Sequence, residues 1–249
     1  MRTLFGLGIY IYLLTLCVAC EEALPMFESE QDRLNFVVEP KQEIPTPVRK
    51  TFVYDPESLT RDTIYVPVKS MGFLRDYDRF VRFEQVKLDS VFNAESGVHY
   101  VAFDDAEVKD LMFLPAGQET AEIPIIVLRD PTLRDTVVVL QLRIVENEYF
   151  KLGDLNRVEV LVEIGDMPMK PANWLSMFGT YGGVKHRFLI NYFGWRFDEE
   201  TFEMFKSDYL YAMTIRTKAQ TELNRVNAER AACGEKPLCE SDGTLVRFQ

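Results

Sequence analysis

The run Arg157-Val158-Glu159-Val160-Leu161-Val162-Glu163-Ile164 decides the fold class, because its side chains alternate strictly. Val158, Val160 and Val162 fall on one face, whereas Glu159, Leu161 and Glu163 fall on the other. A repeat of two residues is typical of a β-strand with one buried face. Just upstream, residues 136–144 read TVVVLQLRI and are rich in the β-branched residues that favour strands. Both stretches therefore predict strands.

Five further runs extend this pattern toward the N-terminus, over residues 34–38, 50–54, 62–68, 81–88 and 121–128. Turn-forming residues separate the runs, such as the pair Asp55-Pro56 and the stretch Pro115-Ala116-Gly117-Gln118. The sequence therefore predicts a mainly β protein with an antiparallel β-sandwich over residues 34–166. Because Pro67 cannot donate a ladder hydrogen bond, we expect it at a sheet edge or a bulge.

The character of the chain changes at residue 167. The stretch Met167-Pro168-Met169-Lys170-Pro171 predicts a stiff linker, and aromatic residues are frequent beyond it. Asp198 has the side chain of a helix N-cap, and apolar residues then recur at helical spacing, which predicts one or two helices over 199–232. Gly234 and Pro237 end the helical stretch, and residues 244–248 predict a final short strand. Residues 167–249 are thus expected to form a smaller α-rich region.

The N-terminus has the pattern of a secretory signal. Arg2 precedes an apolar run from Leu4 to Ala19, which is too short to span a bilayer as a helix. Leu16-Cys17-Val18-Ala19-Cys20 resembles a bacterial lipobox, in which the last cysteine is acylated and becomes the mature N-terminus. We therefore predict a signal peptide over 1–19, lipidation of Cys20, and a tether over 20–33. The alternative is an ordinary signal peptide that is cleaved nearby.

Acyl chains on Cys20 would make the lipid bilayer the first partner of the protein, since two or more chains give stable anchoring. Glu21 and Glu22 directly follow and resemble the acidic signal that sends lipoproteins of Bacteroidetes-type bacteria to the outer face of the outer membrane. We therefore expect a lipid-anchored protein of the outer membrane that faces the cell exterior.

Composition limits the classes of function. Of 249 residues, 47% are hydrophobic and 12% aromatic, which describes a chain that buries a sizeable core. Its 28 basic and 39 acidic residues give a formal net charge of −11. The basic residues are scattered, whereas nucleic acid requires a basic stripe or patch. Nucleic acid is therefore excluded as an expected partner.

The cysteines fit an oxidising compartment. Cys17 leaves with the signal peptide and Cys20 takes the lipid, so that Cys233 and Cys239 remain and enclose a short loop, residues 234–238. We predict a disulfide between them. A zinc site at this pair is not expected, because zinc takes three or four ligands and the chain has only two histidines, His99 and His186. The sequence predicts no metal and no cofactor.

Catalytic motifs are not found. The chain has no G-x-S-x-G elbow, no H-E-x-x-H, no P-loop and no G-x-G-x-x-G. The one glycine-rich stretch, Gly179-Thr180-Tyr181-Gly182-Gly183, would need a following helix to cradle phosphate, but residues 184–193 are expected to form a strand. His99 and His186 are expected to be hydrogen-bonded structural residues. We predict no catalytic residue.

Acidic residues leave two alternatives open. Glycosidases use two carboxylates. Two groups are candidates for such a pair: Glu146 with Glu148, and Asp104 with Asp105 and Asp110. The alternative is that these residues are only solvated acidic surface. Loop carboxylates at the end of a sandwich also converge on calcium in some proteins, and Asp104, Asp105, Asp130 and Asp166 are the candidates.

Aromatic residues are the remaining candidates for a binding site. Trp174, Tyr181 and Trp195 lie in loop-like sequence and have the ring faces on which sugars stack. We assign them as candidate ligand-binding residues for a glycan or peptide. The alternatives are a contact with another protein and ordinary core packing.

Several motifs together resemble a known family. Gly97-Val98-His99-Tyr100 and the stretch 113–125, with its P-x-G turn and I-P-I strand, are similar to the pattern of Calx-beta-like surface domains. With the lipobox and the stretch 178–188, the chain resembles a family of Bacteroidetes surface lipoproteins whose genes accompany SusC/SusD-type nutrient importers. The resemblance implies an Ig-like or Calx-beta-like sandwich and an accessory role beside such an importer. It carries over no active-site residue.

The leading hypothesis is therefore a non-enzymatic outer-membrane lipoprotein that helps a SusC/SusD-type importer capture glycan or peptide nutrients. One alternative is a surface glycoside hydrolase or peptidase that uses an unrecognised carboxylate pair. The other is an adhesin or structural lipoprotein, which would have no nutrient ligand.

Overall fold

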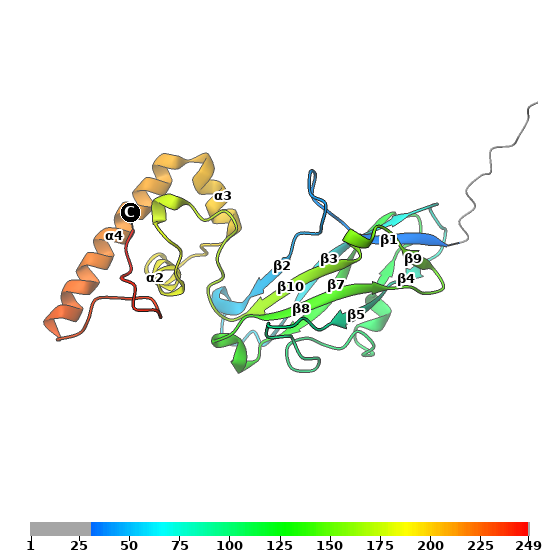
Figure 1. Cartoon of the computed structure of the whole chain (residues 1–249), viewed down its shortest axis with the longest axis horizontal. Helices are drawn as coiled ribbons and strands as arrows, with labels where there is room; N and C mark the ends of the chain where they lie inside the picture. The colour runs from blue at the N-terminus through cyan, green and yellow to red at the C-terminus, as the bar shows by residue number, and fades with distance from the viewer. Residues whose placement is uncertain (1–30, 249) are drawn as a thin grey trace, which may run out of the picture. The chain divides into compact units, whose positions relative to one another are not determined.

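A computed structural model describes residues 31–248 (Figure 1). The predicted signal peptide, Cys20 and most of the predicted tether lie outside these residues. Within them, ten β-strands precede three α-helices. The strands are β1 Asp32–Phe36, β2 Val48–Thr51, β3 Arg61–Met71, β4 Arg79–Phe80, β5 Arg82–Val86, β6 Phe113–Leu114, β7 Thr120–Leu128, β8 Val138–Val145, β9 Phe150–Leu152 and β10 Glu159–Gly165. The helices are α2 Gly183–Phe193, α3 Glu199–Ser207 and α4 Tyr209–Ala232. The prediction of a mainly β protein with a C-terminal helical region is confirmed.

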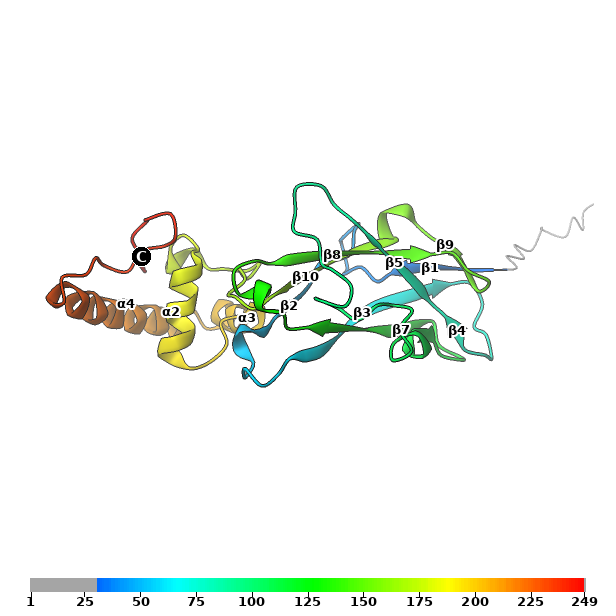
Figure 2. The same cartoon turned by 90° about the horizontal axis from the view of Figure 1, so that it is seen from below.

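The two large sheets pack face to face. One has the strand order β7-β3-β1-β9 and the other β2-β10-β8-β5, whereas β4 and β6 form a small third sheet. Figure 2 shows β7 and β8 in separate layers. Inward side chains of both sheets form one buried cluster, which includes Leu34, Phe36, Val66, Val68, Ile123, Ile125, Leu140, Leu142, Val160 and Val162. The alternation seen in the sequence thus places one face of each strand in a shared core.

Each of the seven predicted runs overlaps a strand, but the prediction of a purely antiparallel sandwich is wrong at two places. β1 pairs with β9 in parallel, and β2 pairs with β10 in parallel. The partners are more than 100 residues apart, so no hairpin turn forces them to run in opposite directions.

Pro67 also departs from its expected place at an edge or bulge. It lies in β3, between β7 and β1. β1 ends at Phe36, and the carbonyl of Pro67 accepts a hydrogen bond from the N–H of Val37 at 2.9 Å. Pro67 has no N–H to donate toward β1, but β1 has already ended at this position. No hydrogen bond of the β1–β3 ladder is therefore lost.

The helical region has a core of its own. Phe178, Leu189, Phe197, Phe202, Phe205, Ile215 and Leu223 are among its buried residues. The predicted N-cap of α3 is confirmed, because the Asp198 carboxylate accepts a hydrogen bond from the N–H of Thr201. Among residues 31–248, no helix combines the length and the apolar character that crossing a bilayer requires.

Two sequence predictions for this region are wrong. Residues 183–193 form α2 instead of a strand, because Lys185, His186 and Leu189 are buried together on one side of the helix. Residues 244–248 form no regular strand, and only an isolated bridge joins Leu245 to Cys239. Val246 and Phe248 instead pack into the helical core, which gives this segment its fixed position.

Candidate functional site

The predicted ligand-binding aromatics Trp174 and Tyr181 contact each other, with ring centroids 5.1 Å apart. Their polar atoms are directed to the protein itself. The indole N–H of Trp174 donates to the carbonyl of Gly179 at 2.8 Å, and the hydroxyl of Tyr181 donates to the carbonyl of Pro168 at 2.9 Å. Both side chains are half-buried; Trp174 packs against the helical core, and the ring of Tyr181 contacts those of Trp174 and His186. This geometry is that of core aromatics with satisfied hydrogen bonds.

Trp195 packs against the same helical core but is joined to Trp174 through the rings of Phe202 and Phe205. Its ring contacts Phe197 at 4.7 Å, Phe193 at 5.7 Å and Phe205 at 6.2 Å between centroids. The structure therefore does not bring the three predicted aromatics together as one surface. Their role in binding a ligand stays a prediction.

His186 lies at the centre of the group that contains Trp174 and Tyr181. It is fully buried, and its Nε2 lies 3.1 Å from the hydroxyl of Tyr54 while its Nδ1 lies 3.4 Å from that of Tyr181. Burial lowers the pKa of His186 to about 4 and raises the pKa of Tyr181 to about 12. His186 and both tyrosines are thus neutral at pH 7. His99 is likewise hydrogen-bonded, to the N–H of Glu95 and to Thr132. Both histidines have the structural environments that the sequence predicts.

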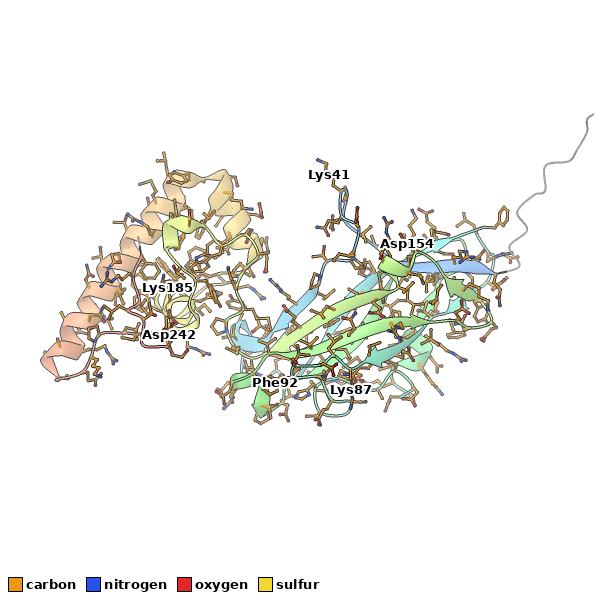
Figure 3. The ribbon with its side chains drawn as sticks, viewed as in Figure 1. Lys41, Lys87, Phe92, Asp154, Lys185 and Asp242 are labelled. Atoms are coloured by element: carbon orange, nitrogen blue, oxygen red, sulfur yellow. The ribbon has the colours of Figure 1, made fainter. Side chains whose placement is uncertain are left out.

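The glycine-rich stretch does lead into a helix, contrary to the sequence prediction, but a carboxylate of the same chain occupies the helix N-terminus. Glu240 accepts hydrogen bonds from the N–H groups of Val184 and Lys185 at 2.8 and 2.9 Å. The ammonium group of Lys185 donates to the carbonyls of Phe178 and Thr180, inside the helical region (Figure 3). Glu240 therefore supplies the negative charge that a helix N-terminus favours.

Cys233 and Cys239 are free thiols in the structure, so the predicted disulfide is not present in it. Cys233 is exposed and follows α4, and the Cys239 thiol lies 3.2 Å from the carbonyl of Pro237. Oxidation of this pair stays a prediction.

The four carboxylates considered for calcium do not form a cluster. Arg129 binds Asp166 through two hydrogen bonds of 2.8 and 2.9 Å, and Asp130 caps the short helix Pro131–Arg134. Asp105 accepts from the N–H of Glu107. Across residues 31–248, no three His, Cys, Asp or Glu side chains converge in an arrangement that would hold a metal ion.

A groove beside β4 and β5 combines aromatic and charged side chains. Its volume is about 520 Å³, within the range of ordinary ligand sites. Three segments line it: residues 80–83, the stretch 103–112, and the turn between β8 and β9. The lining residues are Phe80, Val81, Arg82, Phe83, Phe103, Asp104, Lys109, Asp110, Met112 and Glu148.

Backbone contacts hold these segments in place. The N–H of Val81 donates to the carbonyl of Met112 at 2.8 Å, which joins the first two segments. The side-chain amide of Asn147 donates to the carbonyl of Phe80 at 2.7 Å, which fixes the turn that carries Glu148. Phe103 packs edge-to-face on Phe83, with 6.3 Å between centroids. The groove is therefore built on strands and on hydrogen-bonded turns.

The chemistry of the groove suits a ligand rich in hydroxyl groups. Phe80 is exposed at the rim, and its ring contacts Tyr149 and Phe113. Arg82 and Lys109 supply donors, whereas Asp104 and Asp110 supply acceptors. None of these four charged side chains forms an ion pair with another group among residues 31–248. Their hydrogen-bonding capacity is therefore open to a ligand.

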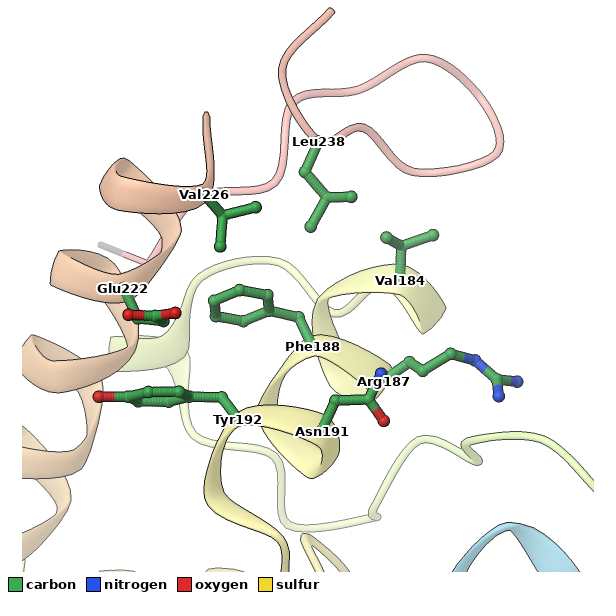
Figure 4. A pocket seen from close by; sticks show the side chains of 8 residues that line it. All are labelled: Val184, Arg187, Phe188, Asn191, Tyr192, Glu222, Val226 and Leu238. Atoms are coloured by element: carbon green, nitrogen blue, oxygen red, sulfur yellow. The ribbon is translucent and has the colours of Figure 1, made fainter. Parts of the chain in front are cut away.

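A second cavity of about 480 Å³ lies between α2 and α4 (Figure 4). Phe188 and Tyr192 point from α2 toward α4, whereas the side chain of Arg187 points away from it. Val184, Val226 and Leu238 make much of the lining apolar. Two charged residues, Arg187 and Glu222, line this cavity, whereas five line the groove beside β5.

One protein family matches most of the chain. Residues 29–195 fit the family described as domain of unknown function DUF4843. The chain belongs to this family. The matched segment of this DUF4843 protein contains every residue that lines the groove beside β5, whereas the second cavity takes Glu222, Val226 and Leu238 from beyond the match. The groove is therefore formed entirely by the family domain.

Similar solved structures come from Bacteroides ovatus. One is a protein of unknown function, with 17% identity over 54% of this chain and 44% of that one, and a TM-score of 0.36. Another is titled "a putative carbohydrate binding protein", with 15% identity over 56% of this chain and 38% of that one, and a TM-score of 0.33. The DUF4843 chain thus spans less than half the length of these proteins. None of the curated proteins matches it.

Proposed function

We propose that this chain is a lipid-anchored, non-enzymatic protein of the outer membrane surface that captures glycans for a SusC/SusD-type importer. The groove beside β5 carries the glycan part of the proposal. It offers an exposed aromatic ring at Phe80 together with donors and acceptors that have no ion-pair partner among the described residues. Rings that contact sugar faces and polar groups that bind hydroxyls are the two elements that such a ligand requires.

The lipid anchor and the membrane location rest on the sequence. The lipobox that ends at Cys20 and the following Glu21-Glu22 support an acylated protein at the cell surface. The SusC/SusD-type partner rests on the family resemblance. Peptide capture is the alternative ligand class, and the binding experiment separates the two.

The first experiment measures glycan binding by the purified protein with calorimetry, after a screen of oligosaccharides. Phe80→Ala and Asp110→Asn should each weaken binding about tenfold or more, since each removes about 1.4 kcal/mol or more of ligand contact. Phe92→Ala and Asp89→Asn are matched controls, because both residues lie outside the groove lining and Phe92 is 70% exposed. Binding that is equally sensitive to the controls, or that is specific to peptides, would count against the glycan groove.

The same groove also allows a rival function, that of a hydrolase, to be tested. Asp104, Asp110 and Glu148 all line it, so that a hydrolase with two carboxylates would have its acids here. Product release from a bound polysaccharide, lost in Asp104→Asn or Glu148→Gln, would favour the hydrolase. The proposal expects binding without product release.

The anchor and the partner need separate measurements. Mass spectrometry of the protein from membranes should give a chain that begins at acylated Cys20. Affinity purification from detergent-solubilised outer membranes should recover transporter subunits. Recovery of the lipoprotein alone would contradict the importer association but would leave the glycan groove untouched.

A further inference from the structure

The loop between β3 and β4, residues 72–78, exposes two consecutive large apolar side chains. Phe73 and Leu74 are each 64% exposed, and Tyr77 in the same loop is 49% exposed. Adjacent exposed apolar residues also occur at Val91 and Phe92 and at residues 209–211, so exposure alone does not single out this loop. What distinguishes it is its attachment to the start of the fold.

The loop is fastened to the first residue of the fold. The Asp32 carboxylate accepts a hydrogen bond from the N–H of Phe73 at 3.3 Å. It also accepts two from Arg75 at 3.0 Å each and one from Arg79 at 2.6 Å. Gly72 has a φ of 151°, and a Cβ there would lie 2.2 Å from Oδ1 of Asp32. The close approach therefore requires glycine, and it holds Phe73 and Leu74 beside the start of β1.

Chain length ties this end of the fold to the proposed anchor. Only residues 21–31 separate Cys20 from Asp32. Eleven residues span at most about 40 Å in any conformation, so an acylated Cys20 keeps Asp32 within that distance of the bilayer. The loop that is fixed to Asp32 is consequently held at high local concentration near lipid.

We propose that Phe73 and Leu74 insert into the lipid surface to which Cys20 is anchored. This inference rests on the proposed lipid anchor. Phe and Leu are the side chains that interfacial segments bury in the boundary between headgroups and acyl chains. The loop has no free cation for anionic lipid, because the Arg75 guanidinium is bound to Asp32 and the Asp76 carboxylate is exposed. The contact therefore suits a zwitterionic surface and weakens on an anionic one.

The test places a tryptophan in the loop of the full acylated protein, reconstituted in phosphatidylcholine vesicles. Leu74→Trp is compared with Leu210→Trp. Leu210 of α4 is 75% exposed beside two exposed tyrosines, Tyr209 and Tyr211, so it matches the apolar exposure of the loop without an attachment to Asp32. Brominated lipid should quench the emission added by Leu74→Trp, and aqueous iodide should not. Leu210→Trp should show the reverse. Trp174 and Trp195 give the same background in both variants.

A second measurement uses the Cys20→Ala chain, which lacks the anchor. Its partition onto the same vesicles should fall about tenfold or more on Leu74→Ser, because a buried leucine contributes at least that factor. Leu245→Ser, at an exposed leucine whose neighbours are Thr244 and the buried Val246, should leave the partition unchanged.

Three outcomes would overturn the inference. Equal access of iodide to both tryptophans on vesicles that carry acylated protein would refute insertion and leave the anchor standing. With transporter present, and only then, the tryptophan of Leu74→Trp could be protected from iodide without being quenched by brominated lipid. That result would assign the loop to a protein partner. A chain without acyl groups at Cys20 would refute the anchor, and with it the placement of the loop at lipid.

Discussion

The hydroxyl oxygen of Tyr54 lies 3.1 Å from Nε2 of His186. Tyr54 ends a short helix, Phe52–Tyr54, directly after β2, whereas His186 belongs to α2. A neutral imidazole has one donor and one acceptor nitrogen, and the second nitrogen of His186 faces Tyr181. Protonation would give the fully buried imidazole two donors toward the two hydroxyls. This contact therefore links the β-rich part and the helical part through a group that resists charging.

The first prediction concerns the pH dependence of stability. Because burial lowers the pKa of His186 from 6.5 to about 4, the unfolded chain binds a proton in this interval and the folded chain does not. Stability should therefore fall as the pH drops from about 6.5 to 4, by about 3 kcal/mol from this residue alone. Urea unfolding of the wild type and His186→Gln at several pH values measures the difference. Tyr54→Phe is the control and should keep the slope; equal slopes for wild type and His186→Gln would contradict the prediction.

The second prediction concerns the buried ion pairs at the start of β1. Asp32 is 2% exposed and Arg79 is 1% exposed. Burial raises the pKa of Asp32, but Arg75 and Arg79 lower it more, so the carboxylate stays charged until the pH falls below its usual value of 3.8. Asp32→Asn leaves a buried guanidinium without its counter-charge and should cost about 3 kcal/mol in the free energy of unfolding.

An exposed ion pair is the control for this variant. Glu119 binds Lys69 at 3.4 Å, with both side chains largely in solvent. Glu119→Gln should cost less than about 1 kcal/mol. Similar losses for Asp32→Asn and Glu119→Gln in denaturant unfolding at pH 7 would show that burial adds nothing to the Asp32 pairs.

The third prediction concerns the cap of α2. A Cβ on Gly182 would lie 2.0 Å from Oε1 of Glu240, so Gly182→Ala should displace the carboxylate from the helix N-terminus. We expect a loss of about 1 kcal/mol, as for Glu240→Ala, because each variant removes the same cap. The double variant should be no less stable than either single variant. At Gly183 a Cβ meets nothing within 4 Å, so Gly183→Ala should not destabilise the protein.

The fourth prediction concerns Cys233 and Cys239. Protein exported to an oxidising compartment should contain no free thiol at these positions, which thiol titration without reductant measures. Closing so short a loop should contribute about 2 kcal/mol, so reductant should lower the melting temperature of the wild type but not of the double serine variant. Two titratable thiols in the exported protein would refute the disulfide.

The β-rich part was largely predictable because strand periodicity is local. The run 157–164 shows its buried face directly, and Val160, Val162 and Ile164 are indeed buried. The pairing of β1 with β9 was not predictable, since nothing in either segment specifies a parallel partner 118 residues away, such as Phe150 for Asp32. Residues 184–193 were wrongly predicted as a strand because Val, Phe, Ile and Tyr favour strands, whereas the burial of Lys185 and His186 on one side of the helix is seen only in the structure.

The groove was predictable only in part. Asp104, Asp110 and Glu148 stand out as acidic residues, but their meeting depends on contacts between segments far apart in sequence. Phe80 was harder to recognise as a binding residue from the sequence, because it is only the last of several large apolar residues in the turn-rich stretch 71–80. The role of the predicted aromatics was not decided by the sequence, because Trp174 and Tyr181 lie in irregular stretches where a ring packs into a core as readily as it faces solvent.

The position of β1 also has a mechanical meaning. Hydrogen bonds join β1 to β3 on one side and to β9 on the other, and the chain enters the fold at Asp32. If a bilayer holds the preceding segment, drag on the protein acts lengthwise along β1. Both ladders and the Asp32 ion pairs then bear the load together in shear, so the rate of unfolding under force should depend on all of them breaking at once.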